Sequence, residues 1–293
     1  MKSIGSGIGG IDLAVQKNLV RAIDRSNDSK IRLATMHRIR QGGDNPAALA
    51  ALESLRSELA ATSAAQDNAA RAAGVARTAD SGLAQVGDLL NTIRDRVVAS
   101  AGDLSDAERS ANQIEIDAAL DAINRIGRTT SLGGQSLLSG SGESTTSPRE
   151  LTFALSADVG ELATIELPAV NTTALGGPEG TLSDLAQGGS ASLDSSNPQD
   201  AINILDAAKA RLLNARAEVG AFERFTIGSA RQALEASEVE LSRSIQMIDD
   251  VDVAAESSKF LRSELLTKFS IANLSAASSR RQTIAGLIED ASS

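Results

Sequence analysis

The sequence contains no cysteine, which excludes disulfide bonds, thiolate metal sites and thiol redox chemistry. It also has no tryptophan, no tyrosine and only five phenylalanines among 293 residues, so the side chains that fill thick globular cores are scarce. Hydrophobic residues still make up 42% of the chain, and many of them are alanine, a strong helix former that buries little area. This composition favours long helices packed along narrow apolar stripes.

Other absences limit the compartment and the partners. No run of about 20 apolar residues occurs, so we expect no membrane-spanning helix. The N-terminus lacks a charged and then apolar leader with a cleavage site, so export would need another route. The net charge of −10 argues against nucleic acid, and the mixed charge of the amphipathic C-terminal stretch argues against an anionic membrane surface.

The residues offer little for catalysis. His37 is the only histidine, so neither a Ser-His-Asp triad nor a histidine pair can form, and we expect a partly buried packing role for it. Gly5, Gly7 and Gly10 form a G-x-G-x-x-G pattern, but only four residues precede it, too few for the strand that a dinucleotide loop requires. We interpret these glycines as a flexible leader. We therefore expect no enzyme and no cofactor, and an enzyme stays a remote alternative.

One acidic cluster deserves a separate interpretation. Asp249, Asp250, Asp252 and Glu256 could be imagined as a metal site, because spacings of three and four bring carboxylates to one helical face. A site for a hard cation normally has a loop with several converging oxygens. We favour a turn between two helices, with acidic residues capping the second helix, and expect no metal.

Residues typical of helix starts and helix ends predict long helices on both sides of an irregular central region. A first helix covers about 11–40 and ends at Gly42 and Gly43, after which Asp44 or Asn45 caps a helix that runs to about Ser100. Ser105 and Glu108 predict a capping box before a helix that reaches about Arg128.

The centre changes character. Alternating apolar residues at 151–155 and 165–167 predict a β-hairpin, whereas 171–197 is rich in Gly, Ser and Thr and is interpreted as a linker with at most one short helical turn. Helical pattern returns after Pro198, and its phase slips near Phe225.

Heptad-like spacing occurs on both sides of this centre. Leu83, Val86, Leu90, Ile93 and Val97 alternate spacings of three and four, as do Leu205, Leu212, Val219 and Phe222 together with two alanines. Because each exposed seam would leave large apolar groups in water, we predict that the two seams pack against each other within the chain.

Several stretches, in this order, resemble bacterial flagellin over nearly the whole chain. They are the turn and helix at 42–61, the helices and loop at 79–140, the hairpin at 151–168, the helix at 210–225, and the acidic turn with the helix after it at 248–266. The resemblance implies a mainly α fold: a helical rod that pairs N- and C-terminal helices, with a small β-hairpin in the central region. It implies five segments: an inner-core helix at 1–45, rod helices at 46–140, a hairpin and surface linker at 141–198, a C-terminal rod helix at 199–255 and an inner-core helix at 256–293.

The resemblance also implies a function. Flagellins polymerise into the extracellular filament that serves bacterial motility, and they leave through the flagellar secretion channel without a cleaved signal peptide. The implied partners are other copies, other flagellins, hook-junction and cap proteins, and an export chaperone. Sparse apolar stripes predict terminal helices that become ordered only against neighbouring subunits. The residues expected in these intersubunit contacts are Leu13, Leu19, Ile23, Ile31, Phe260, Leu265, Ile284 and Leu287.

Two alternatives stay open. A hook-associated junction protein shares the two-ended helical plan, although the acidic turn at 248–256 favours flagellin. A non-flagellar coiled-coil protein that binds a partner would stay monomeric or dimeric.

Overall fold

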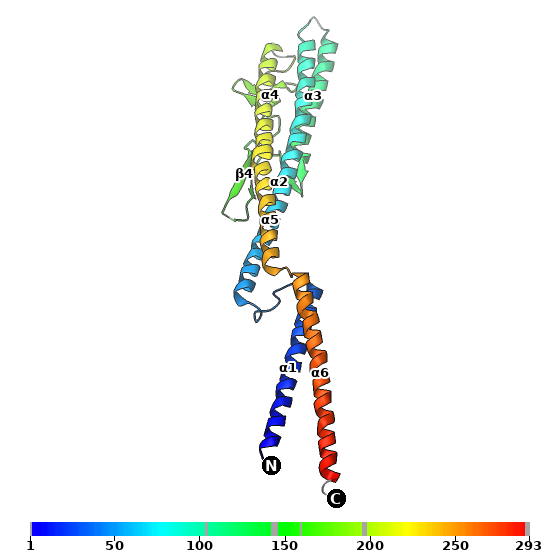
Figure 1. Ribbon diagram of the computed structural model, residues 1–293. Helices are drawn as coiled ribbons and strands as arrows, with labels where there is room; N and C mark the ends of the chain where they lie inside the picture. Colours follow the sequence, from blue (N-terminus) through cyan, green and yellow to red (C-terminus); the bar gives the residue numbers. More distant parts are fainter. Residues whose placement is uncertain (1, 103–104, 142–145, 159, 195–197, 291–293) are drawn as a thin grey trace. The chain divides into compact units, whose positions relative to one another are not determined.

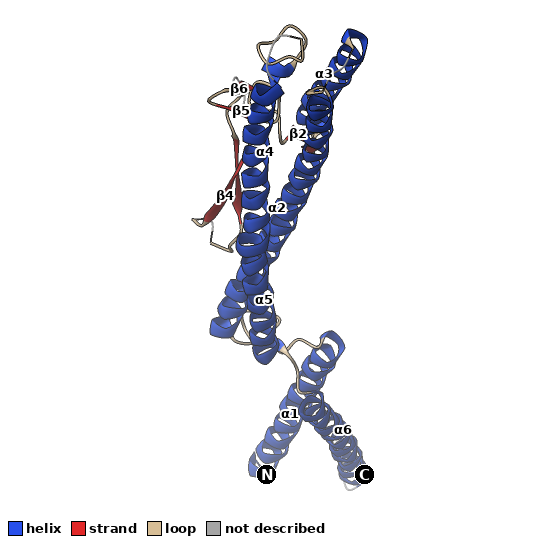
Figure 2. Cartoon of the chain, turned by 90° about the horizontal axis from the view of Figure 1, so that it is seen from above, coloured by secondary structure: helices blue, strands red, loops and turns tan. Residues whose placement is uncertain are grey.

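The computed structural model describes residues 2–102, 105–141, 146–158, 160–194 and 198–290 (Figure 1). It divides into two compact units, which we call the terminal unit (1–57 and 241–293) and the rod unit (58–240). Long helices make up most of both units, and short antiparallel strand pairs accompany them in the rod unit (Figure 2). The predicted mainly α fold class is thereby confirmed.

In the rod unit, the part of α2 (Pro46–Ala99) from residue 58 onward forms a hairpin with the helix that follows it. This next helix is α3 (Asp106–Thr129), and Asn112 Nδ2 on α3 donates a hydrogen bond to Ser100 Oγ at 2.9 Å. The predicted capping box is present, since Ser105 accepts from the backbone N–H of Glu108 and the Glu108 side chain accepts from that of Ser105.

The C-terminal half of the rod unit is one nearly continuous helix. α4 (Pro198–Ala221) passes through a π-helical turn, η2 (Phe222–Ile227), into α5 (Gly228–Asp249). A π turn adds a residue to the helical repeat, which explains the phase slip near Phe225 and returns Ile227 to the buried face.

α4 runs antiparallel to α2. Arg216 Nε lies 2.8 Å from Asp80 Oδ1, and Lys209 Nζ donates to Asn91 Oδ1 at 2.8 Å. The two seams expected from the heptad spacing lie in a single buried cluster, in which every one of the nine predicted residues is at most 8% exposed.

Three strand pairs flank these helices. β1 (Ser131–Leu132) pairs with β2 (Gln135–Ser136), and β5 (Gly176–Gly177) pairs with β6 (Gly180–Thr181). The predicted hairpin consists of β3 (Arg149–Ala154) and β4 (Leu162–Leu167), in register with Leu151 opposite Ile165. Its apolar side packs on α4, and the rings of Phe153 and Phe222 lie 6.5 Å apart.

The expected linker at 171–197 is wrong for its described part. Residues 171–194 contain β5, β6 and the 3₁₀ turn η1 (Leu182–Leu185), and both leucines of η1 are fully buried. The buried side chain of Gln113 holds this segment: Nε2 donates to Leu185 O at 2.9 Å, and Oε1 accepts from Leu193 N at 3.0 Å. The leucines are irregularly spaced, so no periodic pattern marks them.

The terminal unit contains α1 (Lys2–Thr35) and α6 (Val253–Asp290), which lie antiparallel with both chain ends on the same side (Figure 1). α1 begins before Gly5, so the expected flexible leader is wrong. It ends at Thr35, earlier than predicted, because Met36 takes a left-handed conformation with φ 59°. Asn45 caps α2 as expected, since its Oδ1 accepts from Ala48 N at 3.2 Å.

Candidate assembly surface

Small and polar side chains line the contact between α1 and α6. On α1, Ala22, Ser26 and Ser29 are buried at helical spacing, and on α6 Glu256 and Ser263 are buried. Small residues let two helix backbones approach closely, but they bury little apolar area. The isolated pair therefore gains little hydrophobic stabilisation from its own interface.

A buried carboxylate connects the two helices. Ser29 Oγ donates to Glu256 Oε1 at 2.8 Å, and Lys259 Nζ donates to Glu256 Oε2 at 3.0 Å. Burial alone would raise the pKa of Glu256, but these hydrogen bonds and the nearby Lys259 and Arg32 charges hold that pKa below its ordinary value. The carboxylate is thus kept ionised inside the pair.

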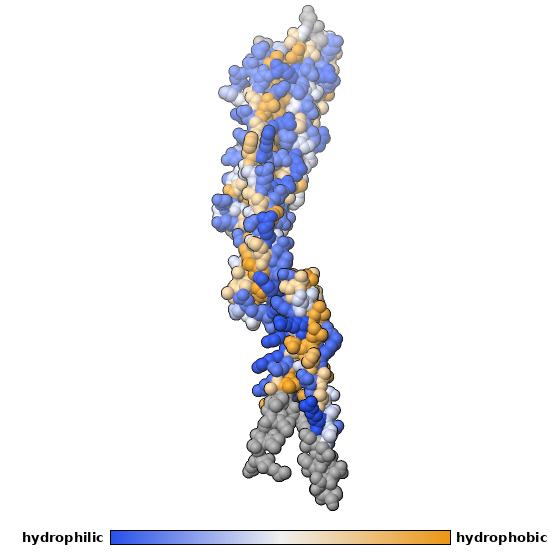
Figure 3. Space-filling model, viewed as in Figure 1, coloured by the Kyte–Doolittle hydropathy of each residue, from blue (hydrophilic) through white to orange (hydrophobic). Residues whose placement is uncertain are grey.

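Large apolar side chains of the same two helices lie exposed. Leu13 is 54% exposed, and Leu265 and Phe269 are 63% and 70% exposed. In Figure 3, hydrophobic side chains gather along the terminal helix pair beside a strongly hydrophilic face. Further exposed apolar residues of the pair are Val20, Ile23, Ile31, Leu261, Leu266 and Ile271.

The residues predicted for intersubunit contacts fall into three groups. Leu13, Ile23, Ile31 and Leu265 are exposed, while Leu19 and Phe260 are half-buried. The ring of Phe260 is covered by Lys30, whose Nζ lies 5.5 Å from its centroid. The side chains of Ile284 and Leu287 lie outside the described residues.

Sequence reasoning missed Leu261, Leu266 and Phe269, which are also exposed on α6. Leu261, Leu265, Leu266 and Phe269 are separated by four, one and three residues, so they form two adjacent apolar stripes on α6. Apolar residues occur on nearly every side of α6, so no amphipathic pattern singled out these positions.

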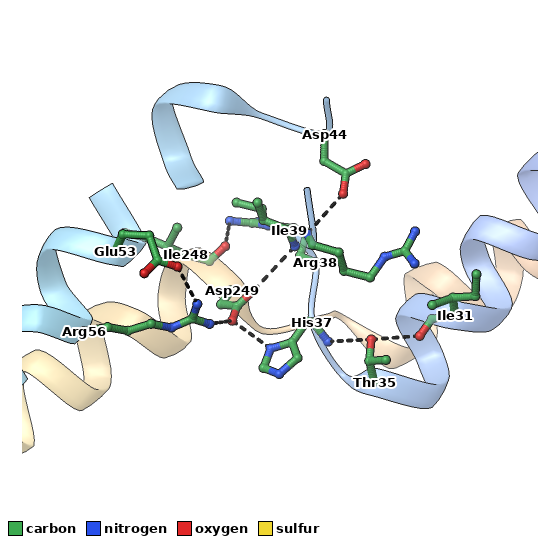
Figure 4. A network of polar contacts seen from close by, with 11 residues as sticks. Ile31, Thr35, His37, Arg38, Ile39, Asp44, Glu53, Arg56, Ile248 and Asp249 are labelled. Carbon is green, nitrogen blue, oxygen red and sulfur yellow. Dashed lines mark hydrogen bonds and ion pairs between the residues drawn. The ribbon is translucent and has the colours of Figure 1, made fainter. Parts of the chain in front are cut away.

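A polar network closes the loop between α1 and α2 onto the end of α5, within the terminal unit (Figure 4). Asp249 has a side chain only 3% exposed, and its Oδ2 lies 2.7 Å from His37 Nδ1 and 2.9 Å from Arg56 Nη2. The backbone N–H of Arg38 donates to Asp249 O at 2.6 Å. Polar groups from the loop after α1 and from α2 therefore contact the buried carboxylate of Asp249, which offsets part of the cost of burying its charge.

This network corrects the expectation of a partly buried packing role for His37, whose side chain is 54% exposed and is held by a polar contact with Asp249. The structure also shows what three residues of the acidic cluster do. Asp249 joins the network, Glu256 lies in the helix pair, and Asp252 caps α6 by accepting from Ala255 N at 3.0 Å. Among the residues that the structure describes, no group of three potential ligands could hold a metal ion.

Comparison with known proteins decides the family. The profile of the bacterial flagellin N-terminal helical region matches residues 10–143, and that of the bacterial flagellin C-terminal helical region matches residues 202–288. The chain belongs to the bacterial flagellin family. The described residues between the matched regions form the hairpin, the packed segment after it and the first residues of α4, in agreement with a flagellin that has no large outer domain.

Individual relatives agree. The chain is 28% identical over 261 residues to the flagellar filament 30.7 kDa core protein of Treponema maltophilum, covering 88% of this chain and 90% of the relative. It is 35% identical over 178 residues to polar flagellin F of Vibrio parahaemolyticus, covering 60% of this chain and 45% of that protein.

A solved structure shows the same fold. A flagellar hook-associated protein of Vibrio parahaemolyticus superposes with a TM-score of 0.59 and 19% identity, over 70% of this chain and 99% of the other. The flagellin matches identify this chain as a structural subunit of a flagellar filament. Flagellar filament proteins are extracellular parts of the flagellum. Among the described helices none is long and apolar enough to cross a membrane.

Proposed function

We propose that this flagellin polymerises with itself into the extracellular filament through α1 and α6, whose apolar faces are covered by neighbouring subunits. The observation that carries the proposal is the exposed apolar face of the terminal pair, which includes Leu13, Leu265 and Phe269. Fully burying one such side chain contributes roughly 1.5–3 kcal/mol. Repetition of a non-closing contact between identical copies produces a helical polymer.

The absence of any catalytic or cofactor-binding constellation in the sequence supports a purely structural role. Export through the flagellar channel without a cleaved signal peptide follows from the same assignment. Hook-junction and cap proteins, an export chaperone and other flagellins are the partners that this function requires.

The decisive experiment is seeded assembly of the purified chain, followed by electron microscopy. We expect long filaments from the wild type and none from the variant Leu265→Asp/Phe269→Asp, because two carboxylates would have to enter an apolar contact. Val239→Asp is the matched control, since Val239 is also an exposed apolar residue but lies in the rod unit. Normal assembly of the double variant would refute the role of α6.

A second candidate, a hook-associated junction protein, is favoured by the structural likeness at TM-score 0.59. This function predicts a chain that stays monomeric even with seeds and binds only to the end of a preformed filament. Growth of long filaments from the chain alone would exclude it.

A further inference from the structure

A groove of about 480 Å³ lies between α1 and α6 in the terminal unit. It is lined by four cations, Arg25, Arg32, Lys259 and Arg262, and by two carboxylates, Asp28 and Glu256. We call it the cationic groove. Like charges that converge in one groove repel each other, so this arrangement is unfavourable in an isolated subunit.

The acidic side chains pair with only part of this positive charge: Glu256 lies 3.0 Å from Lys259 and 4.0 Å from Arg32, and Arg32 also lies 3.6 Å from Asp44. Both oxygens of Glu256 already accept hydrogen bonds, one from Ser29 and one from Lys259. Asp28 lies 3.6 Å from Arg40, which is a further cation from outside the groove. The carboxylates that line the cationic groove therefore already have partners and leave Arg25 and Arg262 unpaired among the described residues.

The arginines retain unused donors. The Nε of Arg32 is buried and has no hydrogen-bond partner within the described part of the chain. Arg25 and Arg262 form no ion pair with any residue that the structure describes. A guanidinium carries five N–H donors in a planar fork that fits a carboxylate, so the cationic groove offers several sites for carboxylate oxygens.

The rest of the molecule has the complementary charge. The rod unit contains 26 acidic and 13 basic residues, whereas the terminal unit contains 12 acidic and 15 basic residues. In the proposed filament, other copies of this chain would pack around each subunit at high local concentration. Carboxylates from those copies are thus the most abundant anions within reach.

We propose that the cationic groove binds carboxylate side chains of a second copy of this chain, the acidic rod unit being the richest source. This inference rests on the proposed self-assembly and deepens it: apolar contacts supply affinity, while the cationic groove selects how neighbouring copies are placed. Leu266, which also lines the groove, lets the apolar face continue up to its edge. An inorganic anion alone is the competing occupant.

The first test measures the critical concentration for seeded assembly. Arg25→Glu/Arg262→Glu should raise it about tenfold or more, because charge-assisted hydrogen bonds to the neighbour are replaced by repulsion. The matched control is Arg21→Glu/Arg280→Glu, which makes the same charge change on exposed positions of the same two helices outside the groove. Circular dichroism of each monomer checks that helix content is retained. An equal effect of both variants would overturn the proposal.

The second test identifies the occupant by zero-length cross-linking with a carbodiimide, which joins the Lys259 amine to a nearby carboxylate. Monomers should give only links within one chain, above all Lys259 to Glu256, whose atoms lie 3.0 Å apart. Filaments assembled from mixed ¹⁴N- and ¹⁵N-labelled protein should add links from Lys259 to a carboxylate of another copy, seen as mixed-isotope peptides.

The outcomes separate the two levels of inference. If wild-type protein does not assemble on seeds, the proposed function fails. If it assembles but Lys259 links only within its own chain, the groove proposal alone is overturned. Stabilisation of the monomer by phosphate or sulfate without any link between chains would assign the groove to an inorganic anion, which also overturns it.

Discussion

The rod unit and the terminal unit are both built from long antiparallel helices, yet they treat their apolar side chains in opposite ways. In the rod unit Leu83, Leu90 and Leu212 are at most 2% exposed, whereas in the terminal unit Leu265 and Phe269 remain largely in water. The rod unit therefore completes its core within one chain. The terminal unit leaves its apolar face uncovered, so under the proposed function its stability should rise with the concentration of other copies.

Their polar contacts differ in the same sense. In the Asp80–Arg216 ion pair of the rod unit, each side chain is about 40% exposed, so the pair contributes little to stability. The carboxylates of Asp249 and Glu256 in the terminal unit are at most 7% exposed. Buried ion pairs are weak sources of stability but strongly penalise any arrangement that separates them. In the terminal unit they therefore define which segments pair.

The largest effect should come from breaking the rod core. Leu90→Ala removes a side chain from the middle of the seam, and we expect it to lower the free energy of unfolding by about 2–5 kcal/mol because a cavity remains. Thermal unfolding followed by circular dichroism measures this change.

Leu265→Ala is the matched variant in the terminal unit. Since Leu265 is exposed in the monomer, we expect a change in unfolding free energy within about 0.5 kcal/mol, together with impaired filament growth. Equal destabilisation by Leu90→Ala and Leu265→Ala would contradict the contrast between the two units.

A smaller effect concerns a close approach in the rod unit. A Cβ added to Gly127 would lie 1.9 Å from the backbone oxygen of Val170, so Gly127→Ala must push α3 away from the segment after β4. We expect a loss of about 1–3 kcal/mol in the free energy of unfolding from this overpacking. Chemical denaturation curves measure it.

Gly220 is the control for helix propensity. Nothing lies within 4 Å of a Cβ placed there on α4, so Gly220→Ala should stabilise the rod unit by about 0.5–1 kcal/mol. The two substitutions are chemically identical and should have opposite signs. The same sign for both would show that contact with Val170 does not govern Gly127.

Periodicity and capping predicted much of the fold. The heptad spacing of Leu83 to Val97 marked a buried seam, and Ser105 with Glu108 marked a helix start, because each feature depends on neighbours within a few residues. The packed segment at 171–194 escaped prediction because its leucines are irregularly spaced and its order depends on Gln113, far away in the sequence.

The exposed apolar residues of the terminal pair were predicted in part. Leu13 and Leu265 were chosen from the terminal segments and are exposed, but the sequence does not tell which face of each helix a partner from the same chain covers. The roles of His37 and Asp249 could not be predicted either, since they arise from contact between residues 212 positions apart. Spacing within one segment carries no information on such contacts.

The smallest effect should be a pH dependence confined to the terminal unit. The pKa of Glu256 in the folded chain is below its ordinary value of 4.5, so its stabilising contribution is fully present above that value. It is lost as the pH falls through the lowered pKa, because protonation removes the attraction to Lys259 and Arg32.

We expect hydrogen-exchange protection factors of α1 and α6 to fall between pH 5 and pH 3 more steeply than those of the rod core. Glu256→Gln cannot titrate there, so it should flatten that fall, leaving the smaller share from Asp44, whose pKa is also lowered, chiefly by the Arg40 backbone N–H. An unchanged pH profile in Glu256→Gln would show that this carboxylate does not hold the helix pair together.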